Sequence, residues 1–192
     1  MKLSLKHVRQ RENHTCGLCA SRVVYRHFKL KNKHLRKAMQ VDEPALPLTD
    51  WDGTLPWDML RTFRHDGFVV DALAPDFSSF RKVINRLERG QPAVVLLGPL
   101  RCLHWVVIGG YDPRKKEFLI VDSTSDTKSG WRTLTTEEAL HDFLLIFSIR
   151  GNDGVKRECS MMELIWEMTC IVPEFFKLGS VLPNSRDLPW PF

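Results

Sequence analysis

Three short apolar runs, separated by turn residues, do most to limit the folds open to this chain. The runs are Ala93–Leu97, His104–Gly109 and Glu117–Asp122, and residues 111–116 between the last two are typical of a turn. Apolar runs of this length with turn signals at both ends are typical of buried strands. Because a short turn joins neighbouring strands in opposite directions, we expect an antiparallel sheet at the centre of the protein.

The segments around these runs show helical or alternating apolar spacing. Thr15 is a plausible N-cap for the first helix, and Gly67 a plausible stop for the second. The order of helices followed by a mostly antiparallel sheet predicts an α+β fold, with N-terminal helices packed on the sheet. The expected helices are Cys16–Phe28, Pro56–Asp66, Phe77–Glu88, Thr135–Asp142 and Ser160–Val172, and the other expected strands are Leu3–Arg9, Phe68–Ala74 and Leu144–Ile149.

Length and composition are those of an ordinary globular protein. The chain has 192 residues, of which 43% are hydrophobic and 27% charged. We expect one domain over residues 1–150, followed by a C-terminal helix and tail, 151–192, packed on the same domain. No apolar run reaches the ~18 residues of a membrane helix, and residues 1–6 lack the apolar core of a signal peptide. We therefore expect a cytoplasmic protein, or one delivered to another cell without a cleaved signal peptide.

A basic stretch follows the first expected helix. It contains Arg22, Arg26, Lys29, Lys31, Lys33, Arg36 and Lys37, in a chain with a net charge of +5. Such a run is most often a solvated helix end and loop. The alternative is a patch that binds an acidic protein or nucleic acid, and the lack of interleaved aromatic residues argues against nucleic acid.

Cys16 is a candidate nucleophile because it begins an expected helix. The positive end of the helix dipole and the unpaired N–H groups there favour a thiolate. Gly17 beside it has no side chain, so we expect a substrate backbone to approach closely. The alternative is that Cys16 is a small buried apolar residue. The number of cysteines is odd, five, so a disulfide framework is not expected.

Partners for such a thiol lie on the expected strands. His104 begins one strand and Asp122 ends the next, so an antiparallel pairing places the carboxylate near the imidazole that it would orient. Gln10, six positions before Cys16, could donate its amide to an oxyanion. Taken singly, His104 could be a core histidine, Asp122 a turn residue and Gln10 an exposed glutamine.

Several motifs resemble those of the bacteriocin-processing (double-glycine) peptidases and their relatives. The segment from Gln10 to Gly17 resembles the family's Gln-x5-Cys-Gly motif, and His104–Asp112 resembles its His-strand-Gly-Tyr block. Val121-Asp122 resembles its Asp block, although Ser123 stands where proline is usual. Gly53–Gly67 and Gly90-Gln91-Pro92 also look like family segments, so the resemblance covers about residues 6–150.

The resemblance implies a papain-like cysteine peptidase with Cys16, His104 and Asp122 as triad and Gln10 at the oxyanion hole, without cofactor or metal. Because no transporter segments follow, we expect a free-standing enzyme that acts on a protein or peptide. It could be a housekeeping protease or a toxin-like effector, and an inhibitor or immunity protein could be its partner. Papain-like sites also serve amidases, deamidases and acyltransferases, all of which form a covalent thiol intermediate.

Two other classes of function remain open. His14, Cys16, Cys19, Cys102 and His104 could supply zinc ligands, although their spacing is not the usual one. A non-catalytic binding module could instead use the basic stretch and an apolar surface rich in tryptophan. The six tryptophans are Trp51, Trp57, Trp105, Trp131, Trp166 and Trp190.

Overall fold

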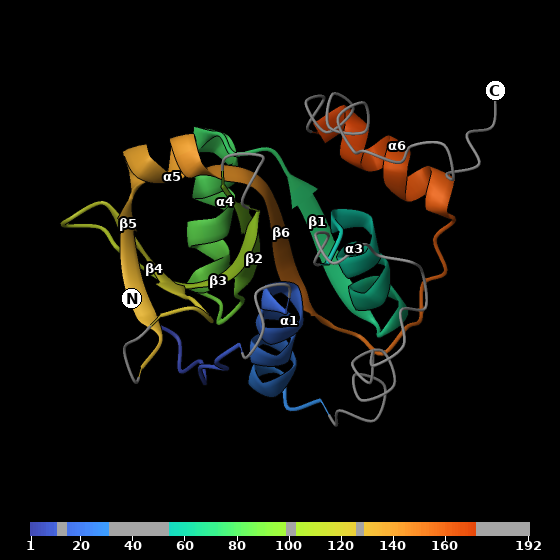
Figure 1. Ribbon diagram of the computed structural model, residues 1–192, viewed down its shortest axis with the longest axis horizontal. Coiled ribbons are helices and arrows are strands. Elements are labelled where there is room, and N and C mark those ends of the chain that lie inside the picture. The colour runs from blue at the N-terminus through green and yellow to red at the C-terminus, as the bar shows by residue number, and fades with distance from the viewer. Residues whose placement is uncertain (11–14, 31–53, 99–102, 126–128, 172–192) are drawn as a thin grey trace.

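A computed structural model describes residues 1–10, 15–30, 54–98, 103–125 and 129–171 (Figure 1). The described helices are α1 (Cys16–His27), α3 (Pro56–His65), α4 (Phe77–Leu87), α5 (Thr136–Asp142) and α6 (Met161–Ile171), and the strands are β1 (Phe68–Leu73), β2 (Ala93–Leu97), β3 (His104–Asp112), β4 (Glu117–Val121), β5 (Trp131–Thr135) and β6 (Phe143–Asn152). The six strands form one antiparallel sheet in the order β1-β6-β2-β3-β4-β5. The predicted α+β class is therefore confirmed.

The two faces of the sheet support two separate apolar cores, because alternate residues of a strand point to opposite faces. In β2, Val94 and Leu96 belong to one core, whereas Val95 and Leu97 belong to the other. Residues of α1, α3 and α6 complete the first core, and residues of α4 and α5 complete the second. The sheet is thus covered by helices on both faces (Figure 1).

Helix α1 lies across the middle of the sheet and packs against β3. Its inner face is apolar, with Val23 and Val24 almost fully buried. Thr15 is the N-cap residue as predicted, but its side chain makes no capping hydrogen bond. At α5, by contrast, Thr135 and Glu138 form a complete capping box, which fixes the start of that helix.

One predicted strand is not formed, and one strand of the sheet was not predicted. Residues 3–9 were expected to form a strand, but the segment makes only an isolated bridge from Lys2 to Gly110. The reason lies in the pairing of β3, because β2 covers it only as far as Ile108. Just the last residues of β3 are left for the N-terminal segment, through hydrogen bonds such as Leu3 N to Gly109 O at 2.7 Å.

Strand β5 was missed, since no strand was expected between Asp122 and the helix that begins at Thr135. Of its five residues only Leu134 is buried, so the alternation that marks a strand is weak. It forms because all five residues pair with β4, from Glu117 opposite Thr135 to Val121 opposite Trp131. This pairing matters for the site, because it sets Arg132 beside the end of β4.

After β6 the chain forms α6, which packs on α3 and β1. Leu164 and Met168 are buried in the first core, and Arg64 of α3 makes a bidentate ion pair with Glu167 at 2.7 and 2.8 Å. The division of the chain near residue 150 stays a prediction. Within the described ranges, no helix combines the length and apolar character needed to cross a membrane.

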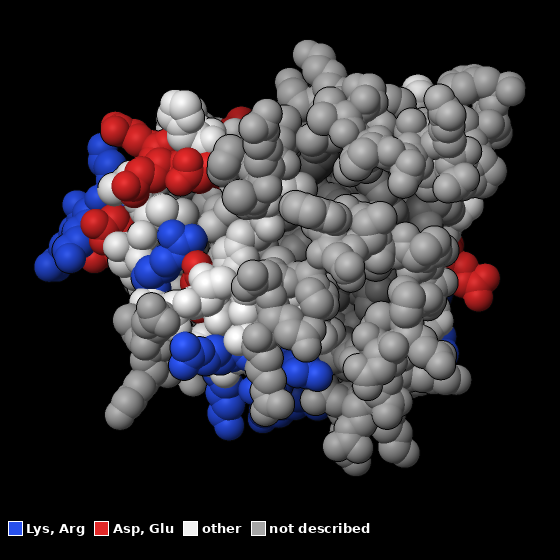
Figure 2. Space-filling model, viewed as in Figure 1, with Lys and Arg blue, Asp and Glu red and all other residues white. Residues whose placement is uncertain are grey.

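Charged side chains are unevenly spread over the visible surface. Figure 2 shows acidic side chains gathered where α5 lies, and α5 carries Glu137 and Glu138 in its first turn. In the same view lysine and arginine lie along the lower edge and also at the left edge, next to the acidic side chains. Of the basic stretch, Arg26 and Lys29 are exposed and Arg22 is half-buried, while residues 31–37 lie outside the described part of the chain.

Candidate active site

Cys16 is the first residue of α1 and is only 4% exposed. Burial by itself would raise the pKa of its thiol, but a hydrogen bond with His104 and backbone hydrogen bonds from Trp105 and Gly17 outweigh it and hold that pKa below the ordinary value. The Gly17 N–H belongs to the helix N-terminus, where N–H groups lack partners within the helix, whereas His104 and Trp105 are supplied by β3. The geometry therefore favours a thiolate at this position.

Gly17 does not leave open space for a substrate, contrary to the prediction. A Cβ atom added there would lie 2.4 Å from the Thr54 side chain and 3.0 Å from Cδ1 of Trp105. The space beside the backbone is thus filled by the protein itself. Trp105 is held in place by its indole N–H, which donates to the carbonyl oxygen of Thr54 over 2.7 Å. Gly17 lets α1 approach this pair closely.

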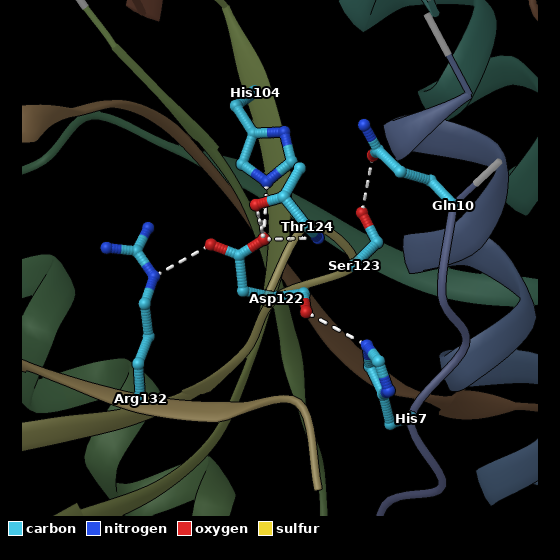
Figure 3. Close-up of polar contacts among 7 residues, drawn as sticks. All are labelled: His7, Gln10, His104, Asp122, Ser123, Thr124 and Arg132. Atoms are coloured by element: carbon cyan, nitrogen blue, oxygen red, sulfur yellow. Dashed lines mark hydrogen bonds and ion pairs between the residues drawn. The ribbon is translucent and has the colours of Figure 1, made fainter. Parts of the chain in front are cut away.

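His104 and Asp122 come together as the strand pairing predicts. His104 begins β3, Asp122 follows β4 directly, and Nε2 of the ring lies 2.7 Å from Oδ1 of the carboxylate (Figure 3). Because Nε2 faces Asp122, the other ring nitrogen, Nδ1, is left for the thiol of Cys16. The imidazole therefore stands between the thiol and the carboxylate.

The charges of these groups support one another. Burial by itself would lower the pKa of His104, but the hydrogen bonds to Asp122 and Cys16 raise it to about 9. For Asp122, burial acts to raise the pKa, and the bonds from His104 and Thr124 overcome this and hold it well below its usual range. At neutral pH the arrangement favours a thiolate and an imidazolium over two neutral groups.

Asp122 has further partners that the sequence did not point to. Its Oδ1 accepts hydrogen bonds from the backbone N of Thr124 at 2.9 Å and from the Thr124 hydroxyl at 2.7 Å. Its Oδ2 lies 2.7 Å from Nε of Arg132, on β5. The Asp-x-Thr spacing is a turn signal that could have revealed Thr124. Arg132 could be found only from the pairing of β4 with β5 (Figure 3).

Gln10 reaches the same turn from the N-terminal segment. Its Oε1 accepts a hydrogen bond of 2.7 Å from the hydroxyl of Ser123, and its backbone N donates to the carbonyl oxygen of Ser123 over 3.1 Å. His7 Nε2 donates to the carbonyl oxygen of Asp122 over 3.0 Å, which anchors the same segment. In Figure 3 the amide nitrogen of Gln10 points away from Ser123. The amide nitrogen of Gln10 is therefore not bonded to Ser123.

The proposed zinc ligands are only partly described. His14 and Cys102 lie outside the described residues, within which no three His, Cys, Asp or Glu side chains form a cluster suited to a metal. The four described cysteines, Cys16, Cys19, Cys159 and Cys170, are free thiols. Burial raises the pKa of Cys19, whereas that of Cys16 is lowered. We therefore expect Cys16 to be the more reactive of the two cysteines of the first helix.

The tryptophans expected to form an apolar surface have mixed positions. Trp105 is 2% exposed and stacks on Phe147, so it belongs to the core. Trp57 and Trp131 are half-buried, and Trp166 is 72% exposed. Trp51 and Trp190 lie outside the described residues. The described tryptophans are thus divided between core and surface.

Comparisons with known proteins agree with this architecture. A C39-like peptidase from Bacillus anthracis matches with a TM-score of 0.56 and 13% identity, covering 83% of this chain and 100% of that one. The peptidase domain of Streptococcus ComA, a bifunctional ABC transporter of a quorum-sensing pathway, matches with a TM-score of 0.53 and 16% identity, covering 77% and 98%. These similarities confirm the expected papain-like fold. Among curated proteins there is no match.

The comparison with protein families is more specific. The model of the Peptidase_C39 like family matches residues 2–146, which is most of the chain and includes Gln10, Cys16, His104 and Asp122. The resemblance inferred from the motifs is thereby confirmed. The chain belongs to the Peptidase_C39 like family.

Proposed function

We propose that this protein is a cysteine peptidase that cleaves a peptide bond in a protein or peptide substrate, with Cys16 as nucleophile. The observation that carries the proposal is the set of contacts of His104, which bonds to Cys16 on one side and to Asp122 on the other. This is the nucleophile, base and orienting group that a thiol hydrolase requires. Membership of a peptidase family supports peptide hydrolysis over other reactions of a thiol.

The chemistry starts from the ion pair. The Cys16 thiolate attacks the carbonyl carbon of the substrate, and the carbonyl oxygen becomes an oxyanion that accepts from Nε2 of Gln10 and the backbone N–H of Cys16. The His104 imidazolium gives its proton to the leaving amine, and the peptide bond breaks. The acyl group stays on the sulfur as a thioester.

Deacylation reverses the role of the imidazole. Neutral His104 takes a proton from a water molecule, which attacks the thioester and releases the acid and the thiol. Asp122 stabilises the imidazolium, which is present when acylation starts and forms again in deacylation, and Arg132 and Thr124 hold Asp122 in position. An amine or alcohol in place of water would give acyl transfer, which is the alternative reaction of such a site.

The test is a comparison of new protein N-termini in a cell lysate treated with wild type or with Cys16→Ala. The proposal predicts N-termini that appear only with wild type and disappear when a thiol-alkylating reagent is added first. Cys19→Ala is the matched control, and it should leave the set of new N-termini unchanged. The same N-termini from Cys16→Ala, or none from wild type, would contradict peptidase activity.

Delivery as a toxin-like effector and binding of an inhibitor or immunity protein remain predictions. They concern where the enzyme acts and what restrains it, and the lysate experiment bears on neither.

A further inference from the structure

Ser123 lies in the turn that follows β4, next to Asp122, and is 5% exposed. Its hydroxyl donates to Oε1 of Gln10 over 2.7 Å, and its carbonyl oxygen accepts from the backbone N of Gln10 over 3.1 Å. Two hydrogen bonds in opposite directions thus join residues 113 positions apart in the chain. Buried hydroxyl groups usually have a partner, and here the partner is the side chain of Gln10, whose amide nitrogen points away from Ser123 (Figure 3).

The two ends of a glutamine amide act in opposite ways on an oxyanion. The NH2 group donates to it, whereas the carbonyl oxygen repels it. Because the two ends are nearly equal in size, rotation by half a turn exchanges them at little steric cost. In the structure the Ser123 hydroxyl donates to Oε1, so Nε2 is the end of the amide that faces away from Ser123 (Figure 3).

We propose that Ser123 is a positioning residue for the oxyanion donor: its hydroxyl orients the Gln10 amide for the reaction at Cys16. The inference rests on the proposed peptidase function. Its consequence is that one turn serves both halves of the site, because Asp122 orients the base and Ser123 orients the oxyanion donor.

The turn itself is firmly held, which makes it suited to this double role. The backbone N of Asp122 donates to the carbonyl oxygen of Gly130 over 2.8 Å, and Ser125 N donates to the Asp122 carbonyl over 3.2 Å. His7 donates to the same carbonyl oxygen over 3.0 Å. These bonds are made by the backbone and by His7, so removal of the Ser123 hydroxyl leaves them in place.

The experiment compares turnover with alkylation. Ser123→Ala should lower kcat about three- to tenfold, the worth of one hydrogen bond, with KM little changed. Gln10→Ala should lower kcat by about 10²–10³-fold, as loss of an oxyanion donor does. In the double variant the Ser123 change should add nothing, because its effect passes through Gln10. Alkylation of Cys16 by iodoacetamide forms no oxyanion, so its rate and pH dependence should equal those of wild type in all three.

A second pair of variants isolates the hydroxyl. Ser123→Thr and Ser123→Val carry nearly the same bulk, so any strain is shared, and only threonine can donate to Gln10. Turnover of the threonine variant should exceed that of the valine variant by the same three- to tenfold factor. Unchanged turnover in Ser123→Ala, a loss that multiplies with that of Gln10→Ala, or an equal fall in alkylation would overturn the inference. Failure of the peptidase proposal is distinguishable, because wild type itself would then show no turnover.

Discussion

The two ends of β4 carry the same local structure but different surroundings. At one end, Oδ1 of Asp112 accepts from the backbone N of Arg114 at 3.0 Å, and at the other, Oδ1 of Asp122 accepts from the backbone N of Thr124 at 2.9 Å. Each aspartate thus closes a turn through its own side chain, as aspartates commonly do. Turn chemistry alone does not distinguish the two.

Burial and the neighbouring strands make the difference. The turn at Asp112 is exposed from Pro113 to Lys116, whereas Asp122 is 4% exposed and uses both carboxylate oxygens. Strand β3 brings His104 to one oxygen and β5 brings Arg132 to the other. An ordinary turn residue becomes an orienting carboxylate because the sheet excludes water from it and supplies cationic partners.

The largest effect is expected where the buried turn acts on the nucleophile. His104→Ala should lower kcat/KM by about 10⁴-fold or more, and Cys16→Ala by as much, because the pair acts as a unit. For the same reason the double variant should be no worse than either single one. Initial rates on a peptide found in the lysate experiment measure this, with thermal unfolding to show that each variant is folded. Turnover of His104→Ala within tenfold of wild type would contradict the assignment.

The next effect compares the two aspartates directly. Asp122→Asn should lower kcat by about 10²–10⁴-fold, because the amide cannot stabilise the imidazolium. Asp112→Asn is the matched control in the equivalent turn at the other end of β4. It should change kcat by less than about twofold, since an exposed turn residue contributes little. Equal losses in the two variants would show that Asp122 matters only as a turn residue.

The pH dependence of stability distinguishes the two ends of β4 in a third way. The pKa of His104 is raised from 6.5 to about 9, so its contribution to stability is fully present below pH 6.5 and is lost as the pH rises through 9. The lowered pKa of Asp122 gives a contribution that is present above pH 3.8 and lost in more acid solution. The contribution of His104 to the free energy of unfolding should therefore fall above pH 6.5, and less steeply in Asp122→Asn, while the lowered pKa of Cys16 acts in the opposite direction.

Urea unfolding at several pH values checks this expectation. Asp112→Asn should retain the slope of wild type between pH 6.5 and 9. If Asp122→Asn retained it as well, the carboxylate would not be the group that raises the pKa of His104.

The smallest effect concerns the residues of left-handed conformation that precede β5 and β4, Gly130 and Lys116. Gly130 has a φ of +67°, and a Cβ there would lie 2.1 Å from the His7 ring. Gly130→Ala should therefore destabilise the protein by about 1–3 kcal/mol. Lys116 has a φ of 55° in the exposed turn, so Lys116→Gly relieves strain but adds unfolded-chain entropy. Its effect should stay within ~1 kcal/mol, and thermal unfolding compares the two.

Much of the fold could be predicted because β2, β3 and β4 are marked by apolar runs and turns. Strand β5 was missed because only Leu134 of its five residues is buried, and pairing with β4 rather than its own pattern makes it a strand. The error at residues 3–9 has the same origin, since the number of free positions on β3 depends on the register of β2. The register of β2 on β3 depends on those two strands, so the pattern of residues 3–9 alone carries no information on it.

For the site, the sequence located the expected triad and missed Thr124 and Arg132, which hold Asp122 in position. His104 and Asp122 were found because the ends of the apolar runs mark the ends of these strands. Ser123 was noted only as a departure from a motif, and its bond to Gln10 joins segments that meet only in the folded protein. The role predicted for Gly17 was wrong because Thr54 and Trp105 occupy the space beside it. Which distant side chain fills a given space cannot be judged from neighbours in the chain.

The central claim is that Cys16 is a thiolate paired with the His104 imidazolium at neutral pH. The most direct measurement is the rate of alkylation of Cys16 by iodoacetamide as a function of pH, followed by peptide mass spectrometry. In wild type the rate should stay high well below pH 9.0, the ordinary pKa of the thiol, and Cys16 should react before Cys19. A rate that rises only near pH 9, the same in His104→Ala as in wild type, would contradict the claim.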